Sequence, residues 1–182
     1  MATKTKRRYE PDRRERILDV ALEVIARYGV AGTTHRRIAE QADVPLGAMT
    51  YYFDGIDKLL QEAFTRFSQA MSIELQGMLA VASSKDEARQ IIIDLVCNNL
   101  WTSERNLVLL FELSAYAVRE PSVRPLLLQW MEVSESYMSQ HFGPAAAKIL
   151  DAFIDGVVMR NIIRKNFISQ EEVAEFIHKI TA

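Results

Sequence analysis

The chain has 182 residues, of which 49% are hydrophobic and 25% charged, and this composition supports a folded core and excludes a disordered chain. It carries no secretory leader and no run of about 18 apolar residues, so we expect a cytoplasmic protein with no membrane-spanning helix. The single cysteine, Cys97, excludes an intrachain disulfide and a cysteine-rich zinc site.

The first segment, before residue 12, shows no apolar periodicity and is strongly basic. Residues 1–60 carry 11 Lys and Arg against 9 Asp and Glu, whereas residues 61–182 carry 11 against 15. The segment is interpreted either as an arm that contacts nucleic acid or as a solubilising tail. Its candidate contact residues are Lys4, Lys6, Arg7 and Arg8.

Three helices are predicted next. Gly29 is a typical stop for the first helix, Thr34 offers a capping hydroxyl to the second, and Pro45 suits the first turn of the third. Asp12 is the expected cap of the first. The predicted ranges are residues 12–28, 35–42 and 46–53.

The rest of the chain is also predicted to be helical. Ser84 with Glu87, and Ser169 with Glu172, form two capping boxes, and Ser103 and Gly143 mark two further helix starts. The fold class is therefore all-α, with a first domain at 1–55 and a second helical domain at 56–182. The helices expected in the second domain cover about 56–78, 85–101, 104–120, 123–142, 145–165 and 170–180.

The second and third helices, joined by a three-residue break, have the outline of a helix-turn-helix. Ala39 is small enough for the two helices to cross closely, and Ile38, Val44 and Met49 are spaced to fill their shared core. Asp43 occupies the turn position that requires a positive φ. Double-stranded operator DNA is the expected partner.

Residues Gly29 to Phe53 resemble the TetR family of bacterial regulators, whose pattern is G-x-x-x-x-T-x-x-x-I-A-x-x-A-G-V-S-x-G-x-x-Y-x-x-F. Asp43 departs from it, and Ile56 stands where the family has a phosphate-binding lysine, so that Lys58 is the substitute candidate. An alternative interpretation of Arg36 is that it belongs to a solvated helix face. Whichever of Tyr51 and Tyr52 points inward is alternatively interpreted as a packing aromatic. The resemblance implies DNA contacts by Thr34, His35, Arg36, Leu46, Gly47, Thr50, Tyr51 and Tyr52.

The segment 145–165 is apolar on more than one face, which a core within one chain does not require. The resemblance implies a homodimer formed through the last two long helices, and the expected interface residues are Phe153, Ile154 and Val157. The alternative is a central helix buried in its own subunit.

The resemblance further implies a pocket for a small, largely apolar effector within the helical domain. Met and aromatic side chains are expected in its wall, with a few polar groups that orient the ligand. The candidates are Asn98, Trp101, Phe111, Tyr116 and Trp130.

The sequence contains no catalytic triad, phosphate-binding glycine loop or metal-ligand spacing, so we expect no enzyme activity, no metal and no cofactor. The predicted function is a TetR-type transcriptional repressor that binds a palindromic operator as a homodimer and responds to an effector. A helical protein-binding adaptor and a ligand-independent DNA-binding regulator remain as alternatives.

Overall fold

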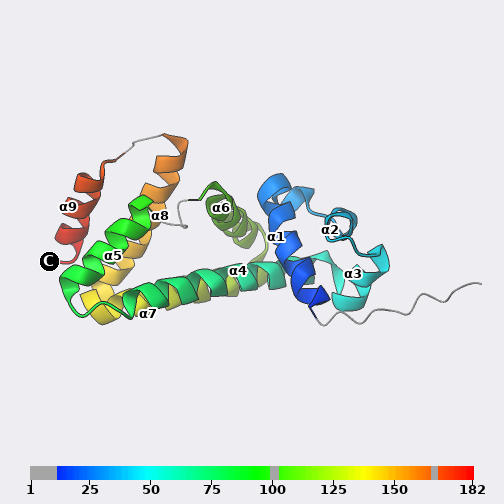
Figure 1. Cartoon of the computed structure of the whole chain (residues 1–182), viewed down its shortest axis with the longest axis horizontal. Coiled ribbons are helices and arrows are strands. Elements are labelled where there is room, and N and C mark those ends of the chain that lie inside the picture. The colour runs from blue at the N-terminus through cyan, green and yellow to red at the C-terminus, as the bar shows by residue number, and fades with distance from the viewer. Residues whose placement is uncertain (1–11, 99–102, 165–167) are drawn as a thin grey trace, which may run out of the picture. The chain divides into compact units, whose positions relative to one another are not determined.

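The computed structural model describes residues 12–98, 103–164 and 168–182, and the regular elements in these ranges are all helical (Figure 1). The all-α prediction is therefore confirmed. In chain order the helices are α1 (Arg13–Gly32), α2 (His35–Gln41), α3 (Leu46–Tyr52), α4 (Gly55–Leu79), α5 (Lys85–Asn98), α6 (Glu104–Arg119), the short 3-10 turn η2 (Pro121–Val123), α7 (Arg124–Phe142), α8 (Pro144–Ile163) and α9 (Gln170–Ile180).

The chain forms two compact units, Met1–Ala63 and Phe64–Ala182. Helix α4 begins in the first unit and ends in the second, so this division lies inside the helix, whereas the boundary expected from the sequence lies just before it. None of the described helices is long and apolar enough to cross a bilayer.

The first helix of the first unit bends at Gly29. This residue has φ 71° and ψ 169°, and one further helical turn follows before the chain leaves α1. The Thr33 hydroxyl donates to the Gly29 carbonyl over 2.8 Å and closes the bend. The helix end expected at Gly29 is therefore a bend, and α1 continues to Gly32. At the other end of α1, Asp12 takes the cap position without a side-chain capping hydrogen bond.

The second and third helices form the predicted helix-turn-helix core. The Thr34 hydroxyl accepts from the Arg37 backbone N–H over 3.2 Å, which caps α2. Ile38 and Met49 are completely buried, and Ala39 is 4% exposed at the crossing. The small Ala39 side chain and the two buried apolar side chains therefore fix how α2 meets α3.

The turn between α2 and α3 depends on Asp43, whose φ is 50°. Pro45 takes the cap position of α3 rather than its first turn, because its ψ of 142° is extended. The Val44 N–H donates to the Ala39 carbonyl over 3.0 Å, which holds the turn closed. The left-handed backbone at Asp43 is therefore a structural requirement of this connection.

Replacing Asp43 with Gly is expected to stabilise the protein by about 0.5 kcal/mol, because relief of left-handed strain exceeds the entropy that glycine adds to the unfolded chain. Thermal denaturation measures the effect. Asp43→Ala is the matched variant, and it should be less stable than the glycine variant. Equal stability of the two would contradict a strained backbone at this position.

The second unit packs α7 along α8 and α5 against α9. One hydrophobic cluster of this unit draws apolar side chains from all four helices and from the second half of α4, whereas Phe67, Leu113 and Trp130 are buried outside that cluster. Four of its largest completely buried side chains are Ile92, Leu95, Met138 and Leu150.

The predicted caps of the second unit are largely present. The Ser169 hydroxyl and the Glu172 carboxylate form the expected reciprocal capping box of α9, and the Ser103 hydroxyl caps α6. At α5 the Glu87 N–H donates to the Ser84 hydroxyl, but the Glu87 carboxylate accepts from the N–H and the hydroxyl of Ser83, each at 2.7 Å. The α5 box therefore includes one residue more than predicted. The ends expected for two helices, at 101 and 165, lie outside the described residues.

Candidate functional site

Helix α3 presents an exposed face of small and hydrogen-bonding side chains. Tyr51 is 81% exposed and Leu46 is 53% exposed, while Gly47 and Thr50 are also on the surface. The Thr50 hydroxyl donates to the Gly47 carbonyl over 3.3 Å, and its oxygen remains able to accept a hydrogen bond. These four predicted contact residues therefore share one accessible surface, which we call the α3 face.

The glycine on the α3 face is not required by packing within the chain. A Cβ atom added at Gly47 would meet no described atom within 4 Å. The absence of a side chain here gives access to a body approaching from outside, such as a nucleic-acid backbone or base edge.

The two tyrosines at the end of α3 have different environments. Tyr52 is half-buried and its ring meets the rings of Tyr51 at 4.9 Å, edge to face, and of Phe53 at 6.4 Å. Tyr52 is thus the inward-pointing tyrosine for which packing was the alternative reading. Tyr51 has the freer side chain for contact with a partner.

The start of α2 lies on the same unit and contains three predicted contact residues. Thr34 and Arg36 are exposed, whereas His35 is half-buried and its Nε2 has no hydrogen-bond partner among the described residues. Lys58 is exposed near the start of α4. The basic candidates Lys4, Lys6, Arg7 and Arg8 lie outside the described residues.

Two arginines brace the first unit, a role that the sequence reading did not assign. The Arg37 guanidinium lies 4.3 Å from the centre of the Tyr28 ring and donates to the Gly32 carbonyl, which ties α2 to α1. Arg14 pairs with Glu62 and lies 5.3 Å from the centre of the Phe53 ring. These contacts hold the frame that carries the α3 face.

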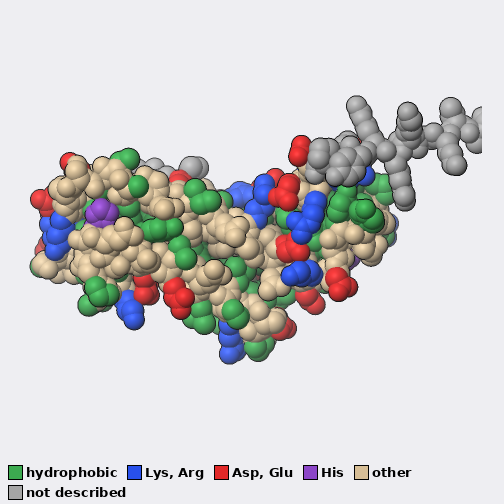
Figure 2. All heavy atoms as spheres, turned by 90° about the horizontal axis from the view of Figure 1, so that it is seen from below, with side chains coloured by type: hydrophobic (Ala, Val, Ile, Leu, Met, Phe, Trp, Pro, Cys, Tyr) green, Lys and Arg blue, Asp and Glu red, His purple; other side chains and the backbone are tan. Residues whose placement is uncertain are grey.

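The surface of the first unit carries both signs of charge. Figure 2 shows basic and acidic side chains interspersed over the part formed by the first helices, rather than a patch of one sign on this face. Arg36 and Lys58 are exposed basic residues that are available to contact a polyanion.

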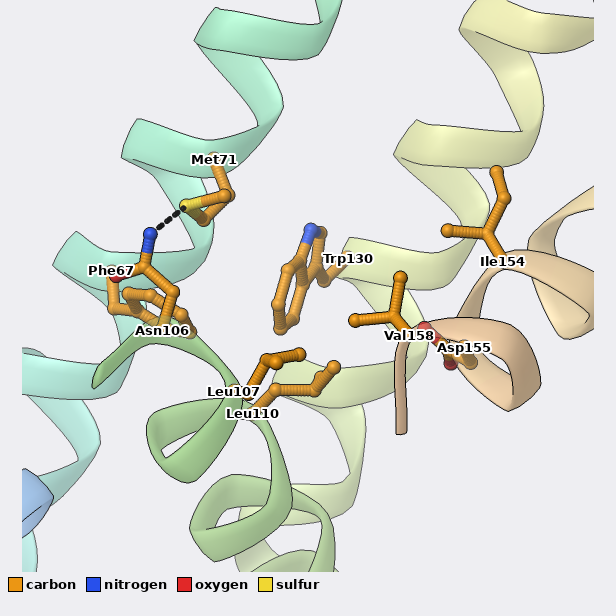
Figure 3. Close-up of a pocket in the computed structure, with 9 residues that line it drawn as sticks. All are labelled: Phe67, Met71, Asn106, Leu107, Leu110, Trp130, Ile154, Asp155 and Val158. Carbon is orange, nitrogen blue, oxygen red and sulfur yellow. Dashed lines mark hydrogen bonds between the residues drawn. The ribbon is translucent and has the colours of Figure 1, made fainter. Parts of the chain in front are cut away.

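In the second unit, α4, α6, α7 and α8 enclose a small cavity around Trp130 (Figure 3). The indole stands between Met71 and Phe67 on one side and the side chains of α8 on the other, and the Asn106 amide donates to the Met71 sulfur over 3.8 Å. The cavity volume is about 10 Å³, which is room for about one water molecule. The wall consists of Phe67, Met71, Asn106, Leu107, Leu110, Trp130, Ile154, Asp155 and Val158.

Trp130 is the one predicted pocket residue that lines this cavity. Tyr116 is buried against Phe64, with ring centres 6.2 Å apart, and Phe111 lies half-buried beside the core, so neither is in the wall. The Trp101 residue and the Asn98 side chain are outside what the structure describes. The sequence reading missed Asp155, although its spacing from Asp151 on an otherwise apolar helix was a visible signal.

Asp151 and Asp155 are half-buried acidic groups of α8 in the second unit. Burial raises the pKa of Asp151 to about 7, helped by the charges of Asp155 and Glu135, and burial raises the pKa of Asp155 to about 6. Neither carboxyl has a hydrogen bond or an ion pair within the described ranges. Burial therefore keeps the pKa of both carboxyls above the ordinary value for aspartate, and no counter-charge among the described residues offsets it.

The predicted dimer residues of α8 are placed mainly inside this chain. Ile154 and Val157 are 7% and 5% exposed and belong to the core, and Phe153 is half-buried with its ring 6.0 Å from Phe176. Ile154 and Val157 therefore belong mainly to the core of their own chain, because a helix that is apolar all round turns one side to that core, and the expected dimer interface stays a prediction. The large apolar side chains that α8 and α9 leave exposed are Ile149, Ile162, Ile163 and Phe176.

The three-helix frame with an exposed third helix defines a helix-turn-helix DNA-binding regulator. Residues 17–63 match the family model described as bacterial regulatory proteins, tetR family. The crystal structure of SCO7518 from Streptomyces coelicolor A3(2) is 42% identical, with a TM-score of 0.88 over 94% of this chain and 99% of that one. The chain belongs to the TetR family of transcriptional regulators.

Two further relatives are named for the molecules they respond to or bind. The nicotine-responsive transcriptional repressor HdnoR of Paenarthrobacter nicotinovorans is 30% identical over 60% of this chain and only 57% of its own length. The multidrug binding protein EbrR, in complex with ethidium, is 26% identical with a TM-score of 0.75 over 94% of this chain and 99% of that one. EbrR has also been crystallised with proflavin and with malachite green.

Proposed function

We propose that the protein is a repressor that binds a palindromic operator as a homodimer and is modulated by a small-molecule effector. The observation that carries the DNA-binding part is the α3 face, where the 81% exposed Tyr51 stands beside small side chains. Such a helix fits a major groove, with hydroxyl groups available for phosphate and base acceptors. Two copies are required because one recognition helix reads only a half-site.

The exposed apolar residues of α8 and α9 support the homodimer. Ile149 and Ile163 are 56% and 77% exposed on the same helix, and a second copy that covered them would remove this apolar surface from water. A second copy of the same helices supplies that surface with two-fold symmetry, and this symmetry matches a palindromic operator.

The cavity around Trp130 and the relatives support effector control. EbrR binds ethidium, and HdnoR is a nicotine-responsive repressor, so small molecules are ligands for proteins of this type. Phe67 and Met71 in the cavity wall belong to α4, which begins directly after α3, so displacement of the wall moves a helix continuous with the first unit. An effector acts only if its affinity differs between the DNA-bound and free states.

The tightness of the cavity is the observation that favours the second candidate, a ligand-independent regulator. A volume of about 10 Å³ admits no effector unless side chains move. Melting temperatures measured with and without candidate ligands distinguish the two, because a ligand that binds only the folded state raises the melting temperature.

Tyr51→Ala is expected to weaken specific operator binding by about tenfold, or 1.4 kcal/mol, because the ring makes its contacts with DNA rather than with the core. Genomic fragments enriched by the wild-type protein provide the operator, and fluorescence anisotropy measures the affinity. The melting temperature should not change.

Val81→Ala is the matched control, since Val81 is 76% exposed and lies in the second unit. It should bind the operator as the wild type does. Wild-type affinity in the Tyr51 variant would overturn the proposed docking through the α3 face.

A further inference from the structure

We propose that the space around Trp130 binds an aromatic organic cation, with Asp155 and Asp151 of α8 facing the positive charge. This inference rests on the proposed function in that the cation is the effector, and it narrows the ligand from a largely apolar molecule to a charged one. Two observations support it. Trp130 lines three hollows of the second unit, and the charged residues in the walls of these hollows are acidic.

Trp130 is the partition between three separate hollows of the second unit. Besides the cavity in Figure 3, it lines an open groove of about 330 Å³ between α4 and α7 and a hollow of about 30 Å³ between α6, α7 and α8. The two smaller hollows have too little volume for an organic ligand, whereas the groove has a volume suited to one. The proposed site therefore requires a displacement of the indole, which would join the groove to the two smaller hollows.

The groove and the two smaller hollows differ in the side chains that line them. The lining of the groove includes neutral polar side chains, among them Ser68, Gln69 and Gln129, beside apolar ones such as Ile73 and Val133, so its mouth is compatible with water. The walls of the two smaller hollows are mainly apolar. The ring of Phe67 lies edge to face with the ring of Trp130, with ring centres 5.5 Å apart. A ligand with an aromatic ring is accommodated between these apolar and aromatic walls.

The charge of the site is negative. Asp155 lines both smaller hollows and Asp151 lines one of them, while none of the described Lys, Arg and His residues lines any of the three. Neither carboxyl has an ion-pair partner within the described ranges, and burial raises the pKa of both. A cation supplies the counter-charge that the fold omits, whereas an anion is repelled and a neutral ligand leaves the carboxyls uncompensated.

An organic cation fits these walls better than a metal ion. Among the described residues no three His, Cys, Asp or Glu side chains are grouped to hold a metal, and apart from Asp155 and Asn106 the residues of the cavity wall are apolar. The indole of Trp130 attracts a positive charge through its ring face. The site therefore offers an organic cation two carboxyls and an aromatic surface together.

The test compares N-methylacridinium, a permanent cation, with acridine, which has nearly the same shape and is uncharged at pH 8. Isothermal titration calorimetry on the full chain at pH 8 is expected to show at least about tenfold tighter binding of N-methylacridinium. Asp155→Asn should reduce that preference by about tenfold, and the double variant with Asp151→Asn should remove it.

The matched control is Glu132→Gln, which changes the same charge at an exposed position of α7 and should keep the wild-type preference. The proposal would be overturned if the wild-type protein bound the two probes equally or bound neither of them. An undiminished preference for the cation in the double variant would also overturn it. The comparison of probes on the wild type does not depend on the folding of any variant.

Operator binding by the same preparations, measured with and without N-methylacridinium, separates this inference from the proposed function. Release of the operator by the cation in the wild type, but not in the double variant, supports both. Loss of charge preference with intact operator binding contradicts the cation site alone. Absence of operator binding contradicts the proposed repressor, while the calorimetric comparison still decides the charge of the ligand.

Discussion

Replacing Val157 with Asp is expected to unfold the second unit rather than to separate two copies of the chain. Val157 is 5% exposed and packs in the core with Leu150 and Val158. An unpaired carboxylate in this surrounding should cost roughly 3 kcal/mol or more of folding free energy. Circular dichroism should show loss of the cooperative thermal transition or a large fall in its midpoint.

The matched substitution is Ile149→Asp, on the side of α8 that the chain leaves exposed. This variant should keep its helical spectrum but sediment as a monomer and lose operator binding, because the charge would enter an apolar seam between subunits. Val81→Asp, also at an exposed position, should remain dimeric. A folded, monomeric Val157 variant would restore the interface originally predicted from the sequence.

The features predicted correctly from the sequence are those determined by residues close together in the chain. Asp43 was expected to have a positive φ because the break between two short helices requires it, and its φ is 50°. The Ser169 capping box needs only residues three positions apart, and it forms as expected. Local backbone chemistry decides such features before any tertiary contact is made.

The candidate sites were less predictable because they depend on which helix faces meet. Ile154 and Val157 lie on a helix that is apolar on several sides, and periodicity does not distinguish the side facing its own core from the side facing another molecule. Trp130 was found because a tryptophan has few alternatives to burial. Its neighbours Asn106 and Asp155 come from α6 and α8, and no local pattern brings these residues together.

Asp151→Asn is expected to raise the free energy of unfolding at pH 8 by about 2 kcal/mol and to have much less effect at pH 5. The cause is burial, which raises the pKa of Asp151 from 3.8 to about 7, with smaller contributions from the charges of Asp155 and Glu135. At pH 8 the wild-type carboxyl is charged in an interior that lacks a counter-charge, whereas asparagine is neutral.

The direction of the pH dependence follows from where the proton is bound. In the range between pH 3.8 and about 7 the folded chain holds a proton on Asp151 that the unfolded chain has released. The contribution of Asp151 to stability is fully present below pH 3.8, where both states hold the proton, falls as pH rises because the unfolded chain releases the proton first, and is lost above about pH 7. Wild-type stability should therefore decrease from pH 5 to pH 8 more steeply than that of Asp151→Asn.

Urea denaturation at both pH values measures the difference, and Glu132→Gln, at an exposed position of α7, should show the wild-type dependence. Parallel curves for the wild type and Asp151→Asn would mean that the carboxyl is hydrated in the folded protein, and the interior charge would then be unavailable to select a cation.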